Sequence, residues 1–335
     1  MLFAENGEYD FIGRSRENNG VQGKMEKLHF EPNPANTFSL AQVGETVCLF
    51  RDKKWYASQN IFILSPIMEE LAKQYKFITA SINKALYPYR SAYIYPILPE
   101  VKNITIKLPV KFGQIDFEFM ENFVAALESR RVAELNNYLL ATGLKDYVLT
   151  AEEEKALNDF NNLEWKEFNL EKLFGKATRG KRLKSDDRII GTLPFVTAGE
   201  ADEGISDFIG NKVEVFESNT TTIDMFGSAK YRNYRYGADD HVAVVHTESL
   251  PIKAAIFVTS AIHKAAHTGE FNYGHNFYAK DADVLNIKLP AKGDVPDYEF
   301  MKNYISAIQK LVIKDVVLYA DSKIEATKSI VKKSK

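Results

Sequence analysis

The histidines form the pattern that is most similar to a metal-binding site in this sequence of 335 residues. Five of the six histidines lie between His241 and His275. His263 and His267 are four residues apart, the spacing of a metal-ligating pair on one face of a helix. No glutamate stands between them to serve as the base of a zinc protease. We therefore expect no metal site, and a metal-dependent hydrolase at these histidines is only a third hypothesis.

Other catalytic signatures are also missing from the sequence. A glycine-rich cofactor loop, the Asn/Asp-Pro-Pro-aromatic tetrapeptide of a methyltransferase, a Walker loop and a Gly-x-Ser-x-Gly motif do not occur. The run Glu152-Glu-Glu-Lys155 resembles the end of a nuclease motif, but no suitable Asp-containing strand precedes it. A charged, solvated helix start explains this run better. The sequence therefore predicts a protein that is not itself catalytic.

Basic and aromatic residues alternate in two runs, Tyr231-Arg-Asn-Tyr-Arg-Tyr236 and Leu49-Phe-Arg-Asp-Lys-Lys-Trp-Tyr56. Arginine and lysine at such places can contact phosphates, while amide and tyrosine side chains reach bases. The alternative is an ordinary solvated hairpin whose basic side chains lie along apolar surface. The formal net charge of −2 gives no global basic footprint, which argues mildly against a polyanionic partner.

An internal repeat organises these residues. Three pairs of segments match at offsets of 180 or 181 residues: Phe77–Lys84 with Phe257–Lys264, Ile104–Pro109 with Leu285–Pro290, and Asp116–Phe123 with Asp297–Tyr304. A weaker match joins Phe11–Gly13 to Phe195–Thr197 at an offset of 184. The chain is therefore a tandem duplication of one unit.

Each copy reads as short strands followed by one long helix, an α+β fold. In the second copy, β-branched runs such as Thr220–Ile223 and Val242–Val245 predict strands. Asp116 and Asp297 stand where helix N-caps belong. We expect a first β-rich domain over residues 1–115, a helical spacer and linker over 116–165, a second domain over 166–295 and a second helical spacer over 296–335.

The two helical spacers share an apolar stripe. Its positions in the second copy are Met301, Ile305, Ile308, Val312, Val316 and Tyr319, and subtracting 181 gives the same stripe in the first copy with one polar interruption. We expect the helices to pair as an antiparallel coiled coil with a pseudo-twofold axis. A helix of about 25 residues spans roughly 38 Å, close to one turn of B-DNA at about 34–36 Å.

The copies differ at their starts. The second has a lead-in, Phe168–Phe174 and the basic stretch Lys176–Arg188, and the first has no room for such a segment before Met1. Two explanations stay open: a naturally clipped chain, or a segment supplied by another part of an assembly. The copies also carry Asn83 and His263 at equivalent positions, which would make different hydrogen bonds to base edges.

Composition indicates a cytoplasmic protein. One cysteine, Cys48, excludes an internal disulfide framework. The N-terminus lacks a signal-peptide pattern, and the longest apolar stretch, around Ala254 to Ile262, is too short to span a bilayer.

Four segments of the second copy are similar to segments of a known protein family. They are Leu193–Ala198, Thr222–Gly227, Tyr236–Val242 and Asn276–Lys280. They resemble the target-recognition domains of restriction–modification specificity (S) subunits, both of type I (HsdS-like) systems and of BcgI-like enzymes. The order of domain, helix, domain and helix is similar too. The resemblance implies a non-catalytic subunit that binds double-stranded DNA at a bipartite site and docks methyltransferase subunits. S-adenosylmethionine would bind those partners, this chain would hold no cofactor, and a restriction subunit or fused nuclease would cut.

Candidate DNA-binding residues follow from the basic, amide and aromatic positions of both copies. They are Arg14, Arg51, Lys53, Lys54, Asn83, Lys84, Arg90, Lys181, Arg182, Arg232, Arg235, Tyr236, His263, Lys264, Asn272 and Tyr273. A competing hypothesis from another class is a scaffold that binds protein or carbohydrate through the duplicated β domains.

Overall fold

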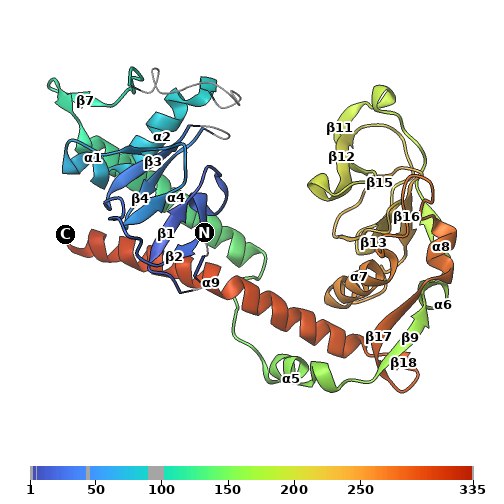
Figure 1. Cartoon of the computed structure of the whole chain (residues 1–335). Helices are drawn as coiled ribbons and strands as arrows, with labels where there is room; N and C mark the ends of the chain where they lie inside the picture. Colours follow the sequence, from blue (N-terminus) through green and yellow to red (C-terminus); the bar gives the residue numbers. More distant parts are fainter. Residues whose placement is uncertain (1–2, 5, 43–45, 90–101, 334–335) are drawn as a thin grey trace. The chain divides into compact units, whose positions relative to one another are not determined.

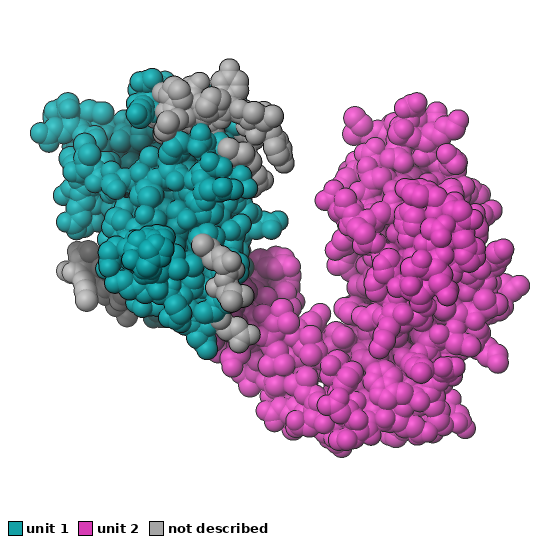
Figure 2. Space-filling view, viewed as in Figure 1, with its two compact units in different colours: residues 1–135, 323–335 teal, residues 136–322 magenta. Residues whose placement is uncertain are grey.

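The computed structural model describes residues 3–4, 6–42, 46–89 and 102–333, with side chains up to residue 327. The chain forms two compact units (Figure 2). Unit 1 comprises residues 1–135 and 323–335, and unit 2 comprises residues 136–322. This division cuts through both long helices, whereas the sequence predicts boundaries at their starts.

Unit 1 holds the first copy of the repeat, from short strands to a long helix (Figure 1). Its elements are β1 (Tyr9–Ile12), η1 (Glu17–Gly20), β2 (Val21–Met25), β3 (Thr37–Ala41), β4 (Cys48–Arg51), β5 (Trp55–Ala57), β6 (Ile61–Leu64), α1 (Glu69–Lys73), α2 (Tyr75–Ala85), η2 (Tyr87–Tyr89), β7 (Val110–Lys111), β8 (Gln114–Ile115) and the start of α4 (Phe117–Ala141). Two three-stranded sheets, in the orders β2-β1-β5 and β4-β3-β6, form its β part.

Unit 2 holds the second copy and a helical linker. Its elements are α5 (Ala151–Asp159), η3 (Phe160–Asn162), β9 (Trp165–Asn169), α6 (Leu170–Phe174), β10 (Thr178–Arg179), η4 (Ser185–Asp187), β11 (Ile190–Val196), η5 (Ala201–Gly204), β12 (Ile205–Ile209), β13 (Thr220–Asp224), β14 (Ala229–Arg232), β15 (Gly237–Ala238), β16 (Val242–Val245), α7 (Ile252–Ala266), α8 (Ala279–Val284), β17 (Asn286–Lys292), β18 (Val295–Pro296) and most of α9 (Tyr298–Lys333).

The strand pairings confirm the duplication. In unit 1, β1 pairs antiparallel with β2 and parallel with β5, and β11 pairs in the same way with β12 and β15. The central strand β3 lies between β4 and β6, as β13 lies between β14 and β16. The α+β class and the order of domain, helix, domain and helix are those that the sequence predicts.

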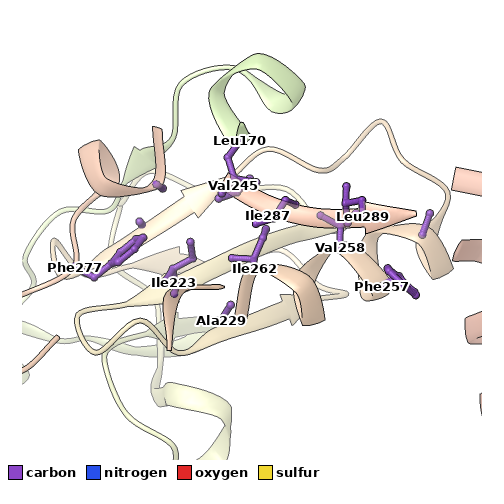
Figure 3. Close-up of a cluster of buried hydrophobic side chains, with 14 of the residues drawn as sticks. Leu170, Ile223, Ala229, Val245, Phe257, Val258, Ile262, Phe277, Ile287 and Leu289 are labelled. Carbon is purple, nitrogen blue, oxygen red and sulfur yellow. The ribbon is translucent and has the colours of Figure 1, made fainter. Parts of the chain in front are cut away.

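A lead-in of three elements in unit 2, β9, α6 and β10, has no counterpart among the described residues of unit 1. β9 pairs with β17, and β10 pairs with the outer edge of β16. Between them, Leu170 at the start of α6 is buried in the core of unit 2, beside Val245 and Ile287 (Figure 3). These elements are the lead-in that the sequence shows only in the second copy.

Both long helices begin at the predicted caps. Asp116 Oδ1 accepts from the Phe119 amide, and Asp297 Oδ1 accepts from the Phe300 amide, each at 2.9 Å. A carboxylate in this place satisfies an amide that has no partner within the helix. None of the helices in the described part of the chain is long and apolar enough to cross a membrane.

The predicted apolar stripe is only partly right. Met301 is fully buried, but Val312 and Tyr319 are 74% and 54% exposed. Val317 and Ala320 are buried instead, each one position after a residue of the predicted stripe, Val316 and Tyr319. The buried face of α9 therefore changes along the helix, which a single heptad-like stripe does not reproduce.

The end of α4 lies beside α9 within unit 2. Lys145, just after α4, donates to Asn136 of α4 at 2.6 Å and to Asp321 of α9 at 2.5 Å. Pairing of the two helices over their remaining length stays a prediction.

Candidate nucleic-acid interface

A buried arginine organises the β part of unit 1. Arg51 Nε and Nη2 donate to Ser39 Oγ at 2.9 and 2.8 Å, and Nη1 donates to the Asn19 carbonyl at 2.7 Å. Its guanidinium lies 5.8 Å from the centre of the Trp55 ring. Trp55 Nε1 in turn donates to Thr37 Oγ1 at 3.0 Å.

Unit 2 repeats this network with related residues. Arg232 Nε donates to Thr222 Oγ1, and its Nη1 donates to the Tyr234 hydroxyl, both at 2.9 Å. Its guanidinium lies 5.9 Å from the centre of the Tyr236 ring, and the Tyr236 hydroxyl lies 2.9 Å from Thr220 Oγ1. The same polar scaffold therefore supports both domains.

Three of the predicted DNA-binding residues belong to this scaffold, and for these three the prediction is wrong. Arg51, Arg232 and Tyr236 are 5%, 1% and 0% exposed, so their side chains do not reach a phosphate or a base. The alternation of basic and aromatic residues arises because β4 and β14 direct their arginines inward, toward hydroxyl groups on the neighbouring strand. A buried guanidinium needs such partners.

Asn83 and His263, at equivalent positions, both bind main-chain groups of a strand. Asn83 Oδ1 accepts from the Cys48 amide and its Nδ2 donates to the Cys48 carbonyl, each at 2.8 Å. His263 Nδ1 accepts from the amide of Ala229, the residue equivalent to Cys48, at 3.1 Å. Each side chain connects a helix to the first residue of a strand, so this repeat position has a structural role, and base contact by either residue stays a prediction.

The neighbouring His267 is similarly engaged. Its Nδ1 lies 3.2 Å from the Phe226 carbonyl, and its ring stacks on His263 with 4.8 Å between centres. Both imidazoles thus hold the end of α7 against β14 and the turn before it.

The loops at one end of each sheet form a common surface, which we call the loop end. In unit 2 it comprises residues 181–184, 197–204, 225–228 and 239–241, which flank the end of β13 and the starts of β14 and β16. In unit 1 it comprises residues 13–20, 42, 46–47 and 58–60. Arg14, Lys181 and Arg182 lie exposed here.

A left-handed turn stands at the loop end of each unit. Asn18 and Asn19 have φ values of 46° and 53°, and the equivalent Asp202 and Glu203 have 48° and 56°. Non-glycine residues seldom adopt this conformation, and paired outliers of this kind cluster at functional sites. Sequence reasoning missed both turns, although a glycine ends each of them at an offset of 184 residues.

Acidic groups distinguish the loop end of unit 2. The carboxylates of Asp239 and Asp240 and the His241 ring lie within 4.8 Å of one another. Burial, reinforced by Asp240, raises the pKa of Asp239. Carboxylates can accept from the amino group of cytosine, so this cluster suits base contact as well as any basic residue.

The remaining predicted DNA-binding residues lie at separate places in the structure. Lys53, Lys54 and Arg235 lie exposed in turns at the opposite end of the sheets, and Arg235 pairs with Glu217. Lys84 and Lys264 line equivalent grooves beside the long helices. Asn272 and Tyr273 are exposed, and Tyr273 contacts Phe226 edge to face. Arg90 lies outside the described residues.

Comparison with known protein families finds a match in the first copy of the repeat. Residues 2–137 match the family model of the type I restriction modification DNA specificity domain. The matched segment is the first copy of the repeat with most of its long helix, and the second copy repeats its strand pairing.

Two relatives match along most of the chain. The type II restriction enzyme BgcI specificity subunit S.BcgI of Heyndrickxia coagulans is 24% identical over 319 residues, covering 92% of this chain and 88% of that protein. The crystal structure of the type I restriction–modification system S subunit from M. genitalium superposes with a TM-score of 0.57 at 14% identity, covering 98% of this chain and 88% of that one. The second likeness establishes the shared fold.

Proposed function

We propose that this chain selects the DNA sequence for a restriction–modification system. Each unit reads one half of a bipartite site with its loop end, and the chain docks the methyltransferase subunits that modify the DNA. The chain itself is not catalytic. S-adenosylmethionine binds the partner methyltransferase, and cleavage, where it occurs, belongs to a further subunit or a fused nuclease.

The observation that carries this proposal is the contrast between scaffold and loops. The arginine networks of the two units share the contact from the arginine to a hydroxyl on the central strand, while the loop ends differ in chemistry. The left-handed turn presents two amides in unit 1, Asn18 and Asn19, and two carboxylates in unit 2, Asp202 and Glu203. Amide and carboxylate groups read different base edges. One scaffold with two polar surfaces is what reading two different half-sites requires.

Docking of a partner protein is supported by the surface of the long helices. Large apolar side chains of α9 in unit 2 lie exposed: Leu311, Val312, Leu318 and Tyr319 are 43–74% accessible. In unit 1, α4 exposes Phe119, Phe123 and Leu127. Contiguous apolar surface of this kind marks protein interfaces.

A methylome tests the proposal directly. The gene is expressed with its neighbouring methyltransferase in a host free of DNA methylation, and the DNA is sequenced by a method that detects N6-methyladenine. We expect a split motif with a fixed gap. Binding of the complex to this motif should weaken steeply with salt, because phosphate contacts release counterions.

Two results would contradict the proposal. Absence of any methylation despite a purified complex with the methyltransferase would favour a protein-binding scaffold. DNA binding that does not respond to salt or to the motif would do the same. A single half-motif would show that only one unit reads DNA.

A further inference from the structure

Two stretches of unit 1 lack strand partners that their counterparts in unit 2 possess. Residues 104–109 form no strand in the described structure, whereas the equivalent β17 pairs with β9 over five residues. The outer edge of β6 is open among the described residues, whereas the equivalent β16 pairs there with β10. Unpaired strand edges are templates for pairing with another chain.

The side chains of these stretches are correspondingly less buried. Ile287 and Leu289 of β17 are fully buried, but the equivalent Ile106 and Leu108 are only half-buried. On the second edge, Val244 is fully buried and the equivalent Ile63 is 42% exposed. The apolar surface that the lead-in covers in unit 2 is therefore open in unit 1.

Aromatic contacts beside the long helix show the same difference. In unit 2, Phe160 stacks on Tyr304 with 4.5 Å between ring centres, and Trp165 of β9 lies 6.3 Å from Phe257. The equivalents of Tyr304 and Phe257 in unit 1 are Phe123 and Phe77, which contact each other at 6.0 Å. Phe123 remains 50% exposed.

The two grooves are otherwise alike in chemistry. The groove of unit 1 runs between α2, residues 105–107 and α4. The groove of unit 2 runs between α7, β17 and α9, and β9 supplies a further wall. Lys107 stands where Lys288 faces Glu167 of β9 at 3.9 Å. The groove of unit 1 thus retains the apolar and charged contacts for a strand of the β9 kind.

We propose that unit 1 is an acceptor for a segment of a second polypeptide that resembles residues 160–184 of this chain. This occupant would add an aromatic strand antiparallel to residues 104–109, place a leucine-bearing helical turn against the core and pair a short strand with β6. Main-chain hydrogen bonds would supply affinity, and the aromatic side chains would supply specificity, as in strand addition to other sheet edges. This acceptor site does not depend on the DNA-reading role.

A synthetic peptide of residues 160–184 tests the acceptor in the full-length chain. Amide exchange is measured with and without the peptide. We expect protection confined to residues 61–64 and 104–109 in unit 1, slowing exchange by about 100-fold at a peptide concentration of about 100 times its Kd. A peptide with Trp165→Asp and Phe168→Asp serves as the matched control and should not protect.

Variants of the groove complete the test. Ile106→Asp should abolish peptide protection, while Val110→Asp, at an exposed position of the β7 hairpin, should not. Unchanged exchange in β3 and β4 shows that the variant domain is folded. Protection elsewhere, or none, overturns the proposal. Concentration-dependent dimers of the chain alone, with both stretches already protected, would also overturn it, because the occupant would then be a second copy.

Discussion

Arg51 stabilises the left-handed turn of unit 1 from inside the domain. Burial lowers the pKa of Arg51 to about 10, since a low-dielectric surrounding disfavours the charged form. The guanidinium therefore stays charged at neutral pH. Its hydrogen bond to the Asn19 carbonyl connects the core directly to the left-handed turn at the loop end.

Removing either arginine should destabilise one domain. Arg51→Ala leaves Ser39 Oγ and the Asn19 carbonyl without their donor, and we expect a loss of about 2–4 kcal/mol of unfolding free energy. Arg232→Ala should do the same in unit 2. Chemical denaturation with amide exchange assigns the loss to a unit. Arg235→Ala, at an exposed position, is the control and should change stability little; equal losses would argue against the buried network.

The left-handed turn of unit 2 should set specificity. Asp202→Asn keeps a residue type that tolerates positive φ but replaces an acceptor-only group with an amide that also donates. We expect the methylome to show a changed or relaxed position in one half of the motif, with the other half intact. Lys53→Ala, at the opposite end of a sheet, should leave the motif unchanged. A change in both halves would show that the turn acts through stability instead.

At the scale of elements, a buried carboxylate joins the linker helix to α9. Glu153 completes the capping box of α5 with Thr150, accepts from Ser306 at 2.5 Å and from Lys310 at 3.0 Å, and is 5% exposed. Lys253 of α7 donates to the same Ser306 hydroxyl at 2.5 Å. Three helices of unit 2 therefore meet at one charged group.

This cluster should make unit 2 sensitive to acid. Burial acts to raise the pKa of Glu153. This effect is outweighed by hydrogen bonds from Ser306, the Thr150 amide and Lys310 and by the positive charge of Lys310, so the pKa of Glu153 is lowered. The stabilisation is therefore complete above the pKa of the unfolded chain, about 4.3, and is lost as pH falls through the folded value.

Thermal melts between pH 7 and pH 3 measure this dependence. Glu153→Gln should lower the melting temperature at pH 7 and flatten its fall with acid. Glu154→Gln, on the exposed side of α5, should retain the wild-type profile. An unchanged slope for Glu153→Gln would place the acid sensitivity in other groups.

The sequence predicted elements better than side-chain roles. Segments matched at constant offsets because a duplicated fold keeps its strand order, and Asp116 and Asp297 could be recognised as caps because capping is a local interaction. Arg232 and His263 could not be placed, since their partners, Thr222 and Ala229, lie 10 and 34 residues away in the sequence. Whether a basic residue points inward depends on that tertiary partner.

At the scale of the whole molecule, the long helices should fix the gap between half-sites. If α4 and α9 pair as the sequence predicts, four residues added within α4 lengthen it by about 6 Å, or about 2 base pairs of B-DNA. We expect a methylome motif with unchanged halves and a wider gap. The same four residues added after Gly143, outside the helix, should leave the gap unchanged. A motif insensitive to both insertions would exclude the helices as a spacer.

Unit 1 takes its last helical turns from residues 323–333 of α9, nearly two hundred residues after its remaining chain. A ribosome releases the N-terminal strands long before it has made this segment. Folding of the first domain is therefore completed only after the second has been synthesised, against the usual N-terminal-first order. In the interval unit 1 lacks its contacts with this helix, and these contacts form in a late, long-range step whose loop-closure entropy slows folding.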